Sequence, residues 1–338
     1  MKIKTAIIGK MGIKAIAAFI FFIAGIMPAR AQQNIQLTQY VFNSLSVNPA
    51  YAGYKEEWFA QMALRNQWTG IQDAPKTGQI SIDGIIDPVR KKMGLGLQIG
   101  ADRLGPQSST SAYLNYAYRI QLDQDANTGI SFGIGGGVSQ FAVDYNKLTP
   151  IDGSDQVATQ GDVSKLIPDF RFGVYYYSPQ WYIGASVLDL LSAKSNEPTS
   201  EGVILNKRHL YLITGLLFNI NETTKIRPSL LVKEDFKGPT SLDLNSMVIF
   251  NDKFWIGGSY RTAVKVWSKD FEKGQTVSRS NSVAGVAQFF VSHAFRIGYS
   301  YDYSVSRLSS IETGSHEITL GLTFSKSPEK KMLTPRFF

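Results

Sequence analysis

The chain has 338 residues, with 35 Lys and Arg against 27 Asp and Glu, three His and no Cys. The missing cysteines exclude disulfides, thiolate metal sites, a cysteine nucleophile and a lipid anchor on Cys. Of all residues, 43% are apolar, 12% are aromatic and 30 are glycines. This composition is too apolar for a disordered chain and too polar for a helical membrane bundle, and it favours a β-rich protein.

Residues 1–31 have the pattern of a cleaved signal peptide. Four lysines precede an apolar run from Ala15 to Met27. Ala29-Arg30-Ala31 then has the small-x-small pattern that signal peptidase requires. An uncleaved membrane anchor is the alternative, but the run is shorter than the roughly 20 residues that a spanning helix needs. Cleavage after Ala31 would leave 30 basic against 27 acidic residues, a net charge of +3. No basic stripe then remains to suggest a nucleic-acid partner.

From residue 58 onwards, apolar and polar side chains alternate with the period of a β-strand. In the first such segment, Trp58, Met62 and Leu64 share one face, while Gln61 and Arg65 share the other. Fourteen segments of this kind are predicted, beginning near residues 58, 77, 93, 108, 129, 169, 180, 208, 225, 240, 253, 281, 293 and 315.

The connections between these segments alternate in length. The long ones include residues 142–168, 189–207, 263–280 and 303–314, and the others are mostly tight turns such as Ser178-Pro179. An even strand count, apolar outward faces with aromatic girdles and loops of alternating length are typical of outer-membrane β-barrels. A secreted β-sandwich or propeller is the alternative, but its outward faces would be polar.

We therefore predict an all-β fold, an outer-membrane barrel of about fourteen antiparallel strands over residues 58–324. Its tight turns and both chain termini would lie in the periplasm of a Gram-negative bacterium, and its long loops at the cell surface. Residues 32–57 would form a periplasmic or lumenal segment, and residues 325–338 a periplasmic tail.

Inward faces of the predicted strands carry charges of both signs. They include Arg65, Asp83, Arg119, Arg171, Asp243, Arg261, Arg296, Asp302 and Glu317. We interpret them as a lattice of charge-assisted hydrogen bonds that stiffens or constricts the lumen. An anion-selective eyelet in an open pore is the alternative. Glycines such as Gly94, Gly96, Gly133 and Gly135 share these faces, and their missing side chains let something else approach the wall.

Residues 32–57 do not alternate. They contain Gln39, Tyr40, Phe42 and Asn43, followed by the run Asn48-Pro49-Ala50-Tyr51-Ala52-Gly53. Asn48-Pro49 can begin a turn, and the aromatic residues are anchors that need a pocket in the lumen or at the periplasmic mouth. A disordered leader is the alternative, but this cluster is unlike a solvated linker. We expect an ordered segment.

This run closely resembles the N-terminal signature of the PorP/SprF family of outer-membrane proteins, which is associated with type IX secretion and gliding. Further matches are Arg65-Asn66-Gln67-Trp68-Thr69-Gly70, Pro168-Asp169-Phe170-Arg171-Phe172-Gly173, Gly298-Tyr299-Ser300-Tyr301-Asp302 and the tail Thr334-Pro335-Arg336-Phe337-Phe338. The resemblance covers essentially the mature chain. Ser44 departs from a proline common in the signature, and Asp189 stands where a His-containing turn is expected.

The resemblance implies a barrel that works with type IX secretion components and with a large secreted surface protein such as an adhesin, which it binds, helps to export or anchors. The signature and the tail with Pro335, Arg336 and Phe337 would contact the machinery on the periplasmic side. The alternative function is a passive channel or substrate-specific porin, for which fourteen strands are wide enough. A plugged lumen would favour the first function and an open lumen the second.

Nothing in the sequence favours catalysis. His209 begins a strand and His293 lies at a turn, while His316 and Glu317 are neighbours on one strand and therefore point to opposite faces. We expect neither enzymatic activity nor a cofactor or metal.

Overall fold

The structure is a computed structural model that describes residues 36–124, 127–147, 163–191, 208–236, 239–264, 266 and 281–324. All of these residues belong to one compact unit of the chain, Gln33–Ser268 with Ser278–Phe338. The predicted signal peptide, the predicted tail with Pro335, Arg336 and Phe337, and most of the predicted loops 142–168, 189–207 and 263–280 lie outside the described residues.

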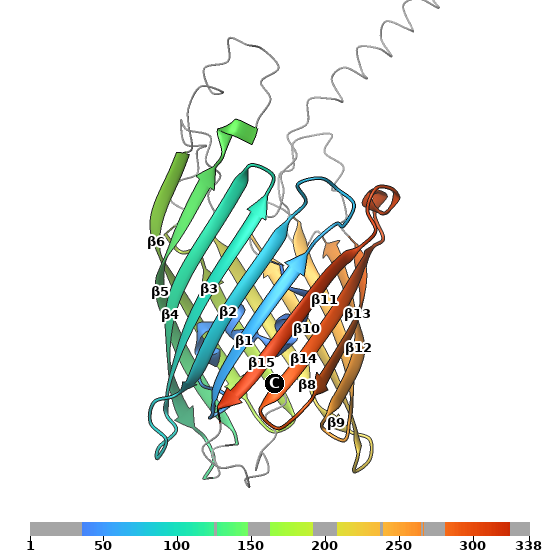
Figure 1. Ribbon diagram of the computed structural model, residues 1–338. Coiled ribbons are helices and arrows are strands. Elements are labelled where there is room, and N and C mark those ends of the chain that lie inside the picture. Colours follow the sequence, from blue (N-terminus) through green and yellow to red (C-terminus); the bar gives the residue numbers. More distant parts are fainter. Residues whose placement is uncertain are drawn as a thin grey trace, which may run out of the picture. The chain divides into compact units, whose positions relative to one another are not determined.

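The described strands form one antiparallel sheet that closes into a barrel (Figure 1). The strands are β1 (Trp58–Asn66), β2 (Lys76–Ile85), β3 (Met93–Leu104), β4 (Gln107–Gln121), β5 (Gly129–Val143), β6 (Val163–Tyr177), β7 (Trp181–Leu188), β8 (His209–Leu216), β9 (Phe218–Asn219), β10 (Thr224–Glu234), β11 (Thr240–Phe250), β12 (Phe254–Val264), β13 (Ser282–Phe290), β14 (Phe295–Ser304) and β15 (Ser315–Phe324). β1 pairs with β15 over its whole length, and this pairing closes the wall.

The barrel has fourteen strands, as predicted. β8 and β9 are separated only by Leu217 and both pair with β10, so they act as one strand with an interruption. The N–H of Leu217 donates to the carbonyl oxygen of Gln180 at 2.7 Å, which offsets the break in the ladder. Among the described residues, no helix is long and apolar enough to cross a membrane.

The predicted beginnings of the strands agree with the structure to within two residues, except for β6. This strand begins at Val163 and not near residue 169, because its ladder with β5 continues upward to the pair Val143 and Val163. Pro168 caused the error, since proline cannot donate to a ladder. In the structure β7 pairs with β6 only from Phe172 onwards, so the missing N–H of Pro168 interrupts no described ladder.

The two ends of the barrel differ, as the lengths of the connections predicted. At one end, which we call the long-loop end, β1, β3, β5, β7, β10, β12 and β14 finish. At the other, the short-turn end, connections such as residues 178–180, 251–253 and 291–294 join the strands. Two connections at the long-loop end are short, namely the two-residue turn Gly105-Pro106 between β3 and β4 and the five-residue connection between β10 and β11. Residues 307–310 form a short 3₁₀ helix, η7 (Arg307–Ser310), in the β14–β15 connection, and η4 (Tyr145–Lys147) follows β5.

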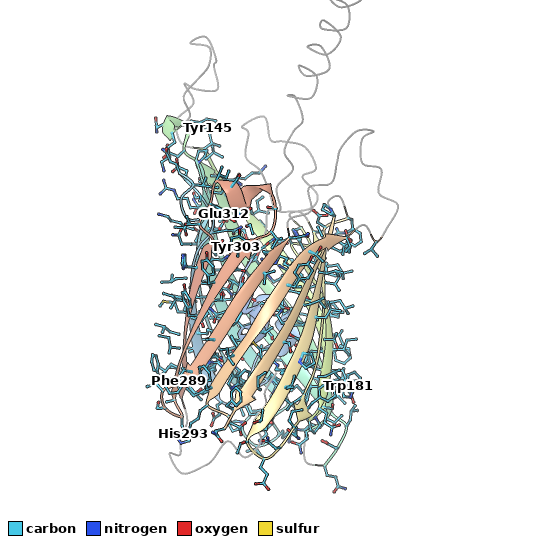
Figure 2. The ribbon with its side chains drawn as sticks, turned by 90° about the vertical axis from the view of Figure 1, so that its right-hand side faces the viewer. Tyr145, Trp181, Phe289, His293, Tyr303 and Glu312 are labelled. Atoms are coloured by element: carbon cyan, nitrogen blue, oxygen red, sulfur yellow. The ribbon has the colours of Figure 1, made fainter. Side chains whose placement is uncertain are left out.

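Side chains alternate along the strands, with apolar residues outward and a mixture of polar, charged and aromatic or aliphatic residues inward. In β1, Leu64 is 51% exposed while its neighbour Arg65 is 4% exposed, and β15 repeats the pattern with Ile318 and Glu317. Outward aromatic residues gather towards both ends: Figure 2 shows Trp181 and Phe289 near the short-turn end and Tyr303 near the long-loop end. This arrangement is the reverse of a soluble sandwich and is the one that a lipid environment selects.

Candidate functional site

The N-terminal segment lies inside the barrel, and we call residues 36–57 the plug. It contains three short 3₁₀ helices, η1 (Thr38–Phe42), η2 (Ser44–Ser46) and η3 (Pro49–Tyr51), seen in blue within the barrel in Figure 1. Asn48 caps η3, because its Oδ1 accepts a hydrogen bond from the N–H of Ala50 at 2.9 Å, and Pro49 supplies the preset φ of a first helical position. Plug and inward wall residues together form the main hydrophobic core.

Two buried carboxylates hold the start of η1. Glu317 in β15 accepts hydrogen bonds from the N–H groups of Thr38 at 2.7 Å and Gln39 at 2.9 Å. Asp302 in β14 accepts from the Thr38 hydroxyl at 2.6 Å. Arg65 in β1 lies 2.8 Å from Asp302 and 3.1 Å from Glu317. Removing one of these charges would leave its partners unpaired in a low-dielectric interior, which is strongly destabilising.

The next residues of η1 contact distant parts of the wall. Gln39 donates from Nε2 to the carbonyl oxygen of Glu317 at 3.1 Å, and its Oε1 accepts from Thr319 at 2.8 Å. The Tyr40 hydroxyl accepts from Asn245 in β11 at 2.7 Å. The ring of Phe42 meets Trp255 of β12 edge-on, with centroids 5.6 Å apart. These three residues alone tie η1 to three strands of the wall, β11, β12 and β15.

Side chains of the wall also donate to main-chain carbonyl groups of the plug. The donors and acceptors are Arg227 to Val41 at 3.2 Å, Arg296 to Phe42 at 3.3 Å, Ser131 to Ala50 at 2.7 Å, Ser186 to Val47, and Arg119 to Ala52. Carbonyl groups at helix ends lack partners within the helix. The wall therefore satisfies the polar backbone of a segment that has no sheet of its own.

The end of the plug lies near the short-turn end. The N–H of Gly53 donates to Asp83 at 2.8 Å. Gly53 has φ +66°, and a Cβ there would lie 2.6 Å from the carbonyl oxygen of Gly84, so both its conformation and its surroundings require glycine. Farther into the barrel, Asn43 accepts a hydrogen bond from Ser81 at 3.4 Å. The plug then leads directly into β1.

Inward glycines of the wall let η3 and its flanking residues touch the wall. A Cβ on Gly133 would lie 2.1 Å from the nitrogen of Ala50, and one on Gly94 would lie 2.0 Å from the oxygen of Ala52. A Cβ on Gly173 would lie 2.1 Å from Oδ1 of Asn48. What approaches these glycines is therefore the plug itself. Gly135 differs, because its neighbours are the wall residues Asn115 and Arg171.

Tyrosines fill the space beside η3. Tyr51 and Tyr54 of the plug lie with ring centroids 5.0 Å apart, and Tyr54 lies 5.5 Å from Tyr175 and 5.1 Å from Tyr177, mostly edge to face. Such pairs contribute about 0.5–1.5 kcal/mol each beyond their buried area. They explain the anchoring role that the aromatic residues of the segment suggested.

Burial also changes the acid–base behaviour of the plug. It raises the pKa of Tyr40 well above its usual value, with Asp243 and Tyr182 acting in the same direction. Burial and the neighbouring Tyr54 likewise raise the pKa of Tyr51. Lys55 lies 3.4 Å from the centroid of the Phe59 ring, and burial together with Arg296 lowers its pKa well below the usual value.

The charges predicted to form a lattice divide into three groups and one separate residue. Arg65, Asp302 and Glu317 form one set of ion pairs, and Asp243 forms another with Arg261 at 2.6 Å and Lys233 at 3.4 Å. Asp83, Arg119 and Arg296 instead bond the plug. Arg171 stands apart and donates to Gln98 at 3.0 Å. Much of the expected wall-to-wall lattice is thus a wall-to-plug lattice.

Several residues that hold the plug were not predicted. They are small or neutral polar residues of the wall, namely Ser131, Ser186, Asn245 and Thr319. The available signal was their place on the inward faces, where an uncharged polar residue has no reason to be buried unless it has a partner.

The three histidines lie apart. His209 Nδ1 is 3.6 Å from Asp189, His316 Nδ1 is 2.7 Å from the Tyr299 hydroxyl, and His293 lies in a short turn (Figure 2). Glu317 is buried on the opposite face of β15 from His316, as expected for neighbours on a strand. Within the described ranges, no group of three or more His, Asp and Glu residues could hold a metal ion.

Solved structures of outer-membrane proteins are similar to this chain at low sequence identity. The Ralstonia pickettii toluene transporter TbuX is 10% identical, with a TM-score of 0.50 over 88% of this chain and 96% of that one. The monoaromatic hydrocarbon channel CymD is 12% identical, with a TM-score of 0.47 over 88% and 95% of the two chains. At such identity the likeness to TbuX shows an outer-membrane barrel fold and nothing finer. No curated protein matches the chain.

One family model covers nearly all of the chain. It describes the type IX secretion system membrane protein PorP/SprF and matches residues 29–322, which include the plug and almost the whole wall. The chain therefore belongs to the PorP/SprF family of type IX secretion system membrane proteins.

Proposed function

We propose that this outer-membrane barrel is a rigid platform that binds, helps to export or anchors a secreted surface protein such as an adhesin. Membership of the PorP/SprF family supports a role in type IX secretion. On this proposal the partners are components of that system and one large secreted protein. The barrel acts by binding alone, without catalysis, cofactor or metal.

The observation that carries the proposal is the plug. Hydrogen bonds or ion pairs of the plug reach strands on all sides of the wall, from β2 at Asp83 to β11 at Asn245 and β15 at Glu317. A channel whose lumen holds such a segment would have to break many buried polar contacts in order to conduct. A platform needs no such opening and gains rigidity from the same contacts.

The orientation is part of the proposal. The long loops would face the cell surface and meet the secreted partner, and the short turns would face the periplasm, as in other outer-membrane barrels. The described chain starts at Gln36, whose Oε1 lies 3.4 Å from Arg261, three residues before the end of β12 at the long-loop end. The plug therefore runs from the long-loop end towards the short-turn end.

Affinity purification tests the platform. The protein, tagged after Phe338, would be extracted from outer membranes in mild detergent, and co-purifying proteins would be identified by mass spectrometry. An unrelated outer-membrane barrel with the same tag gives the background. We expect a large secreted protein or type IX components to be enriched over that background.

Conductance measurements in planar bilayers test the alternative function, a porin. A barrel that is recovered alone, and that conducts ions steadily in planar bilayers with currents that fall when Arg65 or Arg261 is replaced, would overturn the platform in favour of a porin. Silent bilayers would count against the porin.

A further inference from the structure

A small cavity with a mixed polar and apolar lining lies between the plug and the long-loop end, and we call it the vestibule. It measures about 50 Å³. Its floor is formed by plug residues such as Tyr40 and Val47, and its walls include Gln79, Arg171 and Lys233, the last of which is one residue before the end of β10. The plug separates it from the short-turn end, so a ligand would reach it from the long-loop end. A cavity of this size has room for a few water-sized groups, so it takes an end group or a side chain and not a folded domain.

Arg171 is the charged group of the vestibule that has no counter-ion in an ion pair among the described residues. Its guanidinium stacks on the ring of Tyr113, with Cζ 3.2 Å from the centroid, and Nη1 donates to Gln98 at 3.0 Å. Its Nε is buried and has no hydrogen-bond partner. Nε and Nη2 form the edge of an arginine that binds a carboxylate with two parallel hydrogen bonds. This edge is held in a fixed plane by the stacking.

A second buried donor lines the same cavity. Gln79 in β2 is 3% exposed, and its Nε2 has no hydrogen-bond partner. An unsatisfied buried donor costs about 1–3 kcal/mol. Two such donors, on strands β2 and β6, favour a ligand that only accepts hydrogen bonds, which is the chemistry of an ionised carboxylate.

The other charges around the vestibule have partners. Lys233 lies 3.4 Å from Asp243, and Asp189 lies 3.6 Å from His209. Asp169, on the same face of β6 as Arg171, accepts hydrogen bonds from the N–H of Leu191 at 2.8 Å and from the Tyr113 hydroxyl at 3.3 Å. Asp169 thus has hydrogen-bond donors and Asp189 has a histidine beside it, whereas Arg171 and Gln79 each keep a buried donor without a partner.

We propose that the vestibule binds a carboxylate of a polypeptide that approaches from the long-loop end, with Arg171 recognising the charge and Gln79 assisting. This proposal rests on the function proposed above, because it takes the secreted partner as the source of the polypeptide. It adds the chemical group by which that partner is held. The carboxylate is either the end of the chain or an Asp or Glu side chain, and the experiment distinguishes the two.

The experiment measures binding of peptide probes to the full-length protein in detergent by fluorescence anisotropy. Three pools of dansyl-labelled hexapeptides without other acidic residues would be compared: one with a free terminal carboxylate, one amidated, and one amidated with a single Asp. We expect one of the two carboxylate pools to bind on the order of tenfold more tightly than the neutral pool, the gain typical of a hydrogen bond to a charged group. Equal binding of all three pools would overturn the proposal.

Variants of the protein test whether the preference for carboxylate peptides arises in the vestibule. R171Q removes the charge and should abolish the preference for carboxylate, whereas R103Q removes an exposed arginine of β3 outside the vestibule and should keep it. If R171Q does not fold, Q79L serves in its place and should reduce the preference by a smaller factor. A preference that survives R171Q would overturn the proposal, and where R171Q does not fold, a preference that Q79L leaves unchanged would overturn it.

Co-purification separates this proposal from the platform. If the secreted partner is recovered with wild-type protein and equally with R171Q, the vestibule proposal fails while the platform stands. If no partner is recovered with wild type, the platform fails. Recovery with wild type and loss with R171Q supports both.

Discussion

Gly133 sets how closely η3 can approach β5, and it shows how much a single residue contributes to this fold. The plug backbone lies where a side chain at this position would be, and the atoms in the way are the main-chain nitrogen and Cα of Ala50. A backbone atom cannot move aside as a flexible side chain would. Glycine is needed here because the backbone of the plug occupies the space of a Cβ, and not because the strand makes a turn at this position.

We therefore expect G133A to lower the free energy of unfolding by about 1–3 kcal/mol, the usual cost of overpacking. The measurement is urea unfolding of the detergent-solubilised protein, followed by tryptophan fluorescence. G285A is the matched control, because Gly285 also lies in a strand and a Cβ there meets nothing within 4 Å. Equal midpoints for both variants would show that the plug does not lie against β5.

The phenol of Tyr40 makes stability depend on pH in the alkaline range. Its pKa is raised in the folded protein, whereas an unfolded tyrosine ionises near pH 10. The stabilisation is complete below about pH 10 and is lost above it, because only the unfolded chain then releases the proton. The free energy of unfolding should fall by up to about 1.4 kcal/mol per pH unit for this group. Y40F should have a shallower slope between pH 10 and 12, and an unchanged slope would contradict the assignment.

At the scale of elements, the plug behaves as the core of the barrel. Fourteen strands enclose a lumen wide enough for a channel or a ligand cavity, and many of the wall residues that face it are polar or charged. Without a segment that fills the lumen, the arginines and carboxylates of the wall would need water molecules as hydrogen-bond partners. With the plug in place, they bond carbonyl and N–H groups of η1 and of the residues around η3.

Removal of the plug should therefore turn the closed barrel into a channel. We expect a variant lacking residues 36–50 to conduct ions in planar bilayers, whereas the wild-type protein is silent or nearly so. G285A, with an intact plug, serves as the control for preparation and insertion. The idea would be abandoned if the wild type conducts as well as the deletion variant at the same salt concentration.

At the scale of the whole molecule, the sequence predicts the wall much better than its filling. Alternation is local, so the starts of thirteen strands could be placed within two residues. Contacts such as Thr38 with Glu317 join residues 279 positions apart and leave no local pattern. The inward glycines and the paired charges indicated that something occupies the lumen, but only the fold identifies the occupant as residues 36–57. Pro168 misled the prediction because its effect depends on whether a neighbouring strand reaches it.

The direction of the plug leads to a test of orientation. Both chain termini were predicted to be periplasmic, and both lie outside the described residues; yet Gln36 lies near the long-loop end while Phe324 ends β15 at the short-turn end. Because the chain has no cysteine, single cysteines can be labelled on intact cells with a membrane-impermeant maleimide. We expect labelling of D73C, in an exposed connection of the long-loop end, and of Q36C, but labelling of H293C only after lysis. Labelling of H293C alone on intact cells would reverse the orientation, and with it the side from which a partner could reach the vestibule.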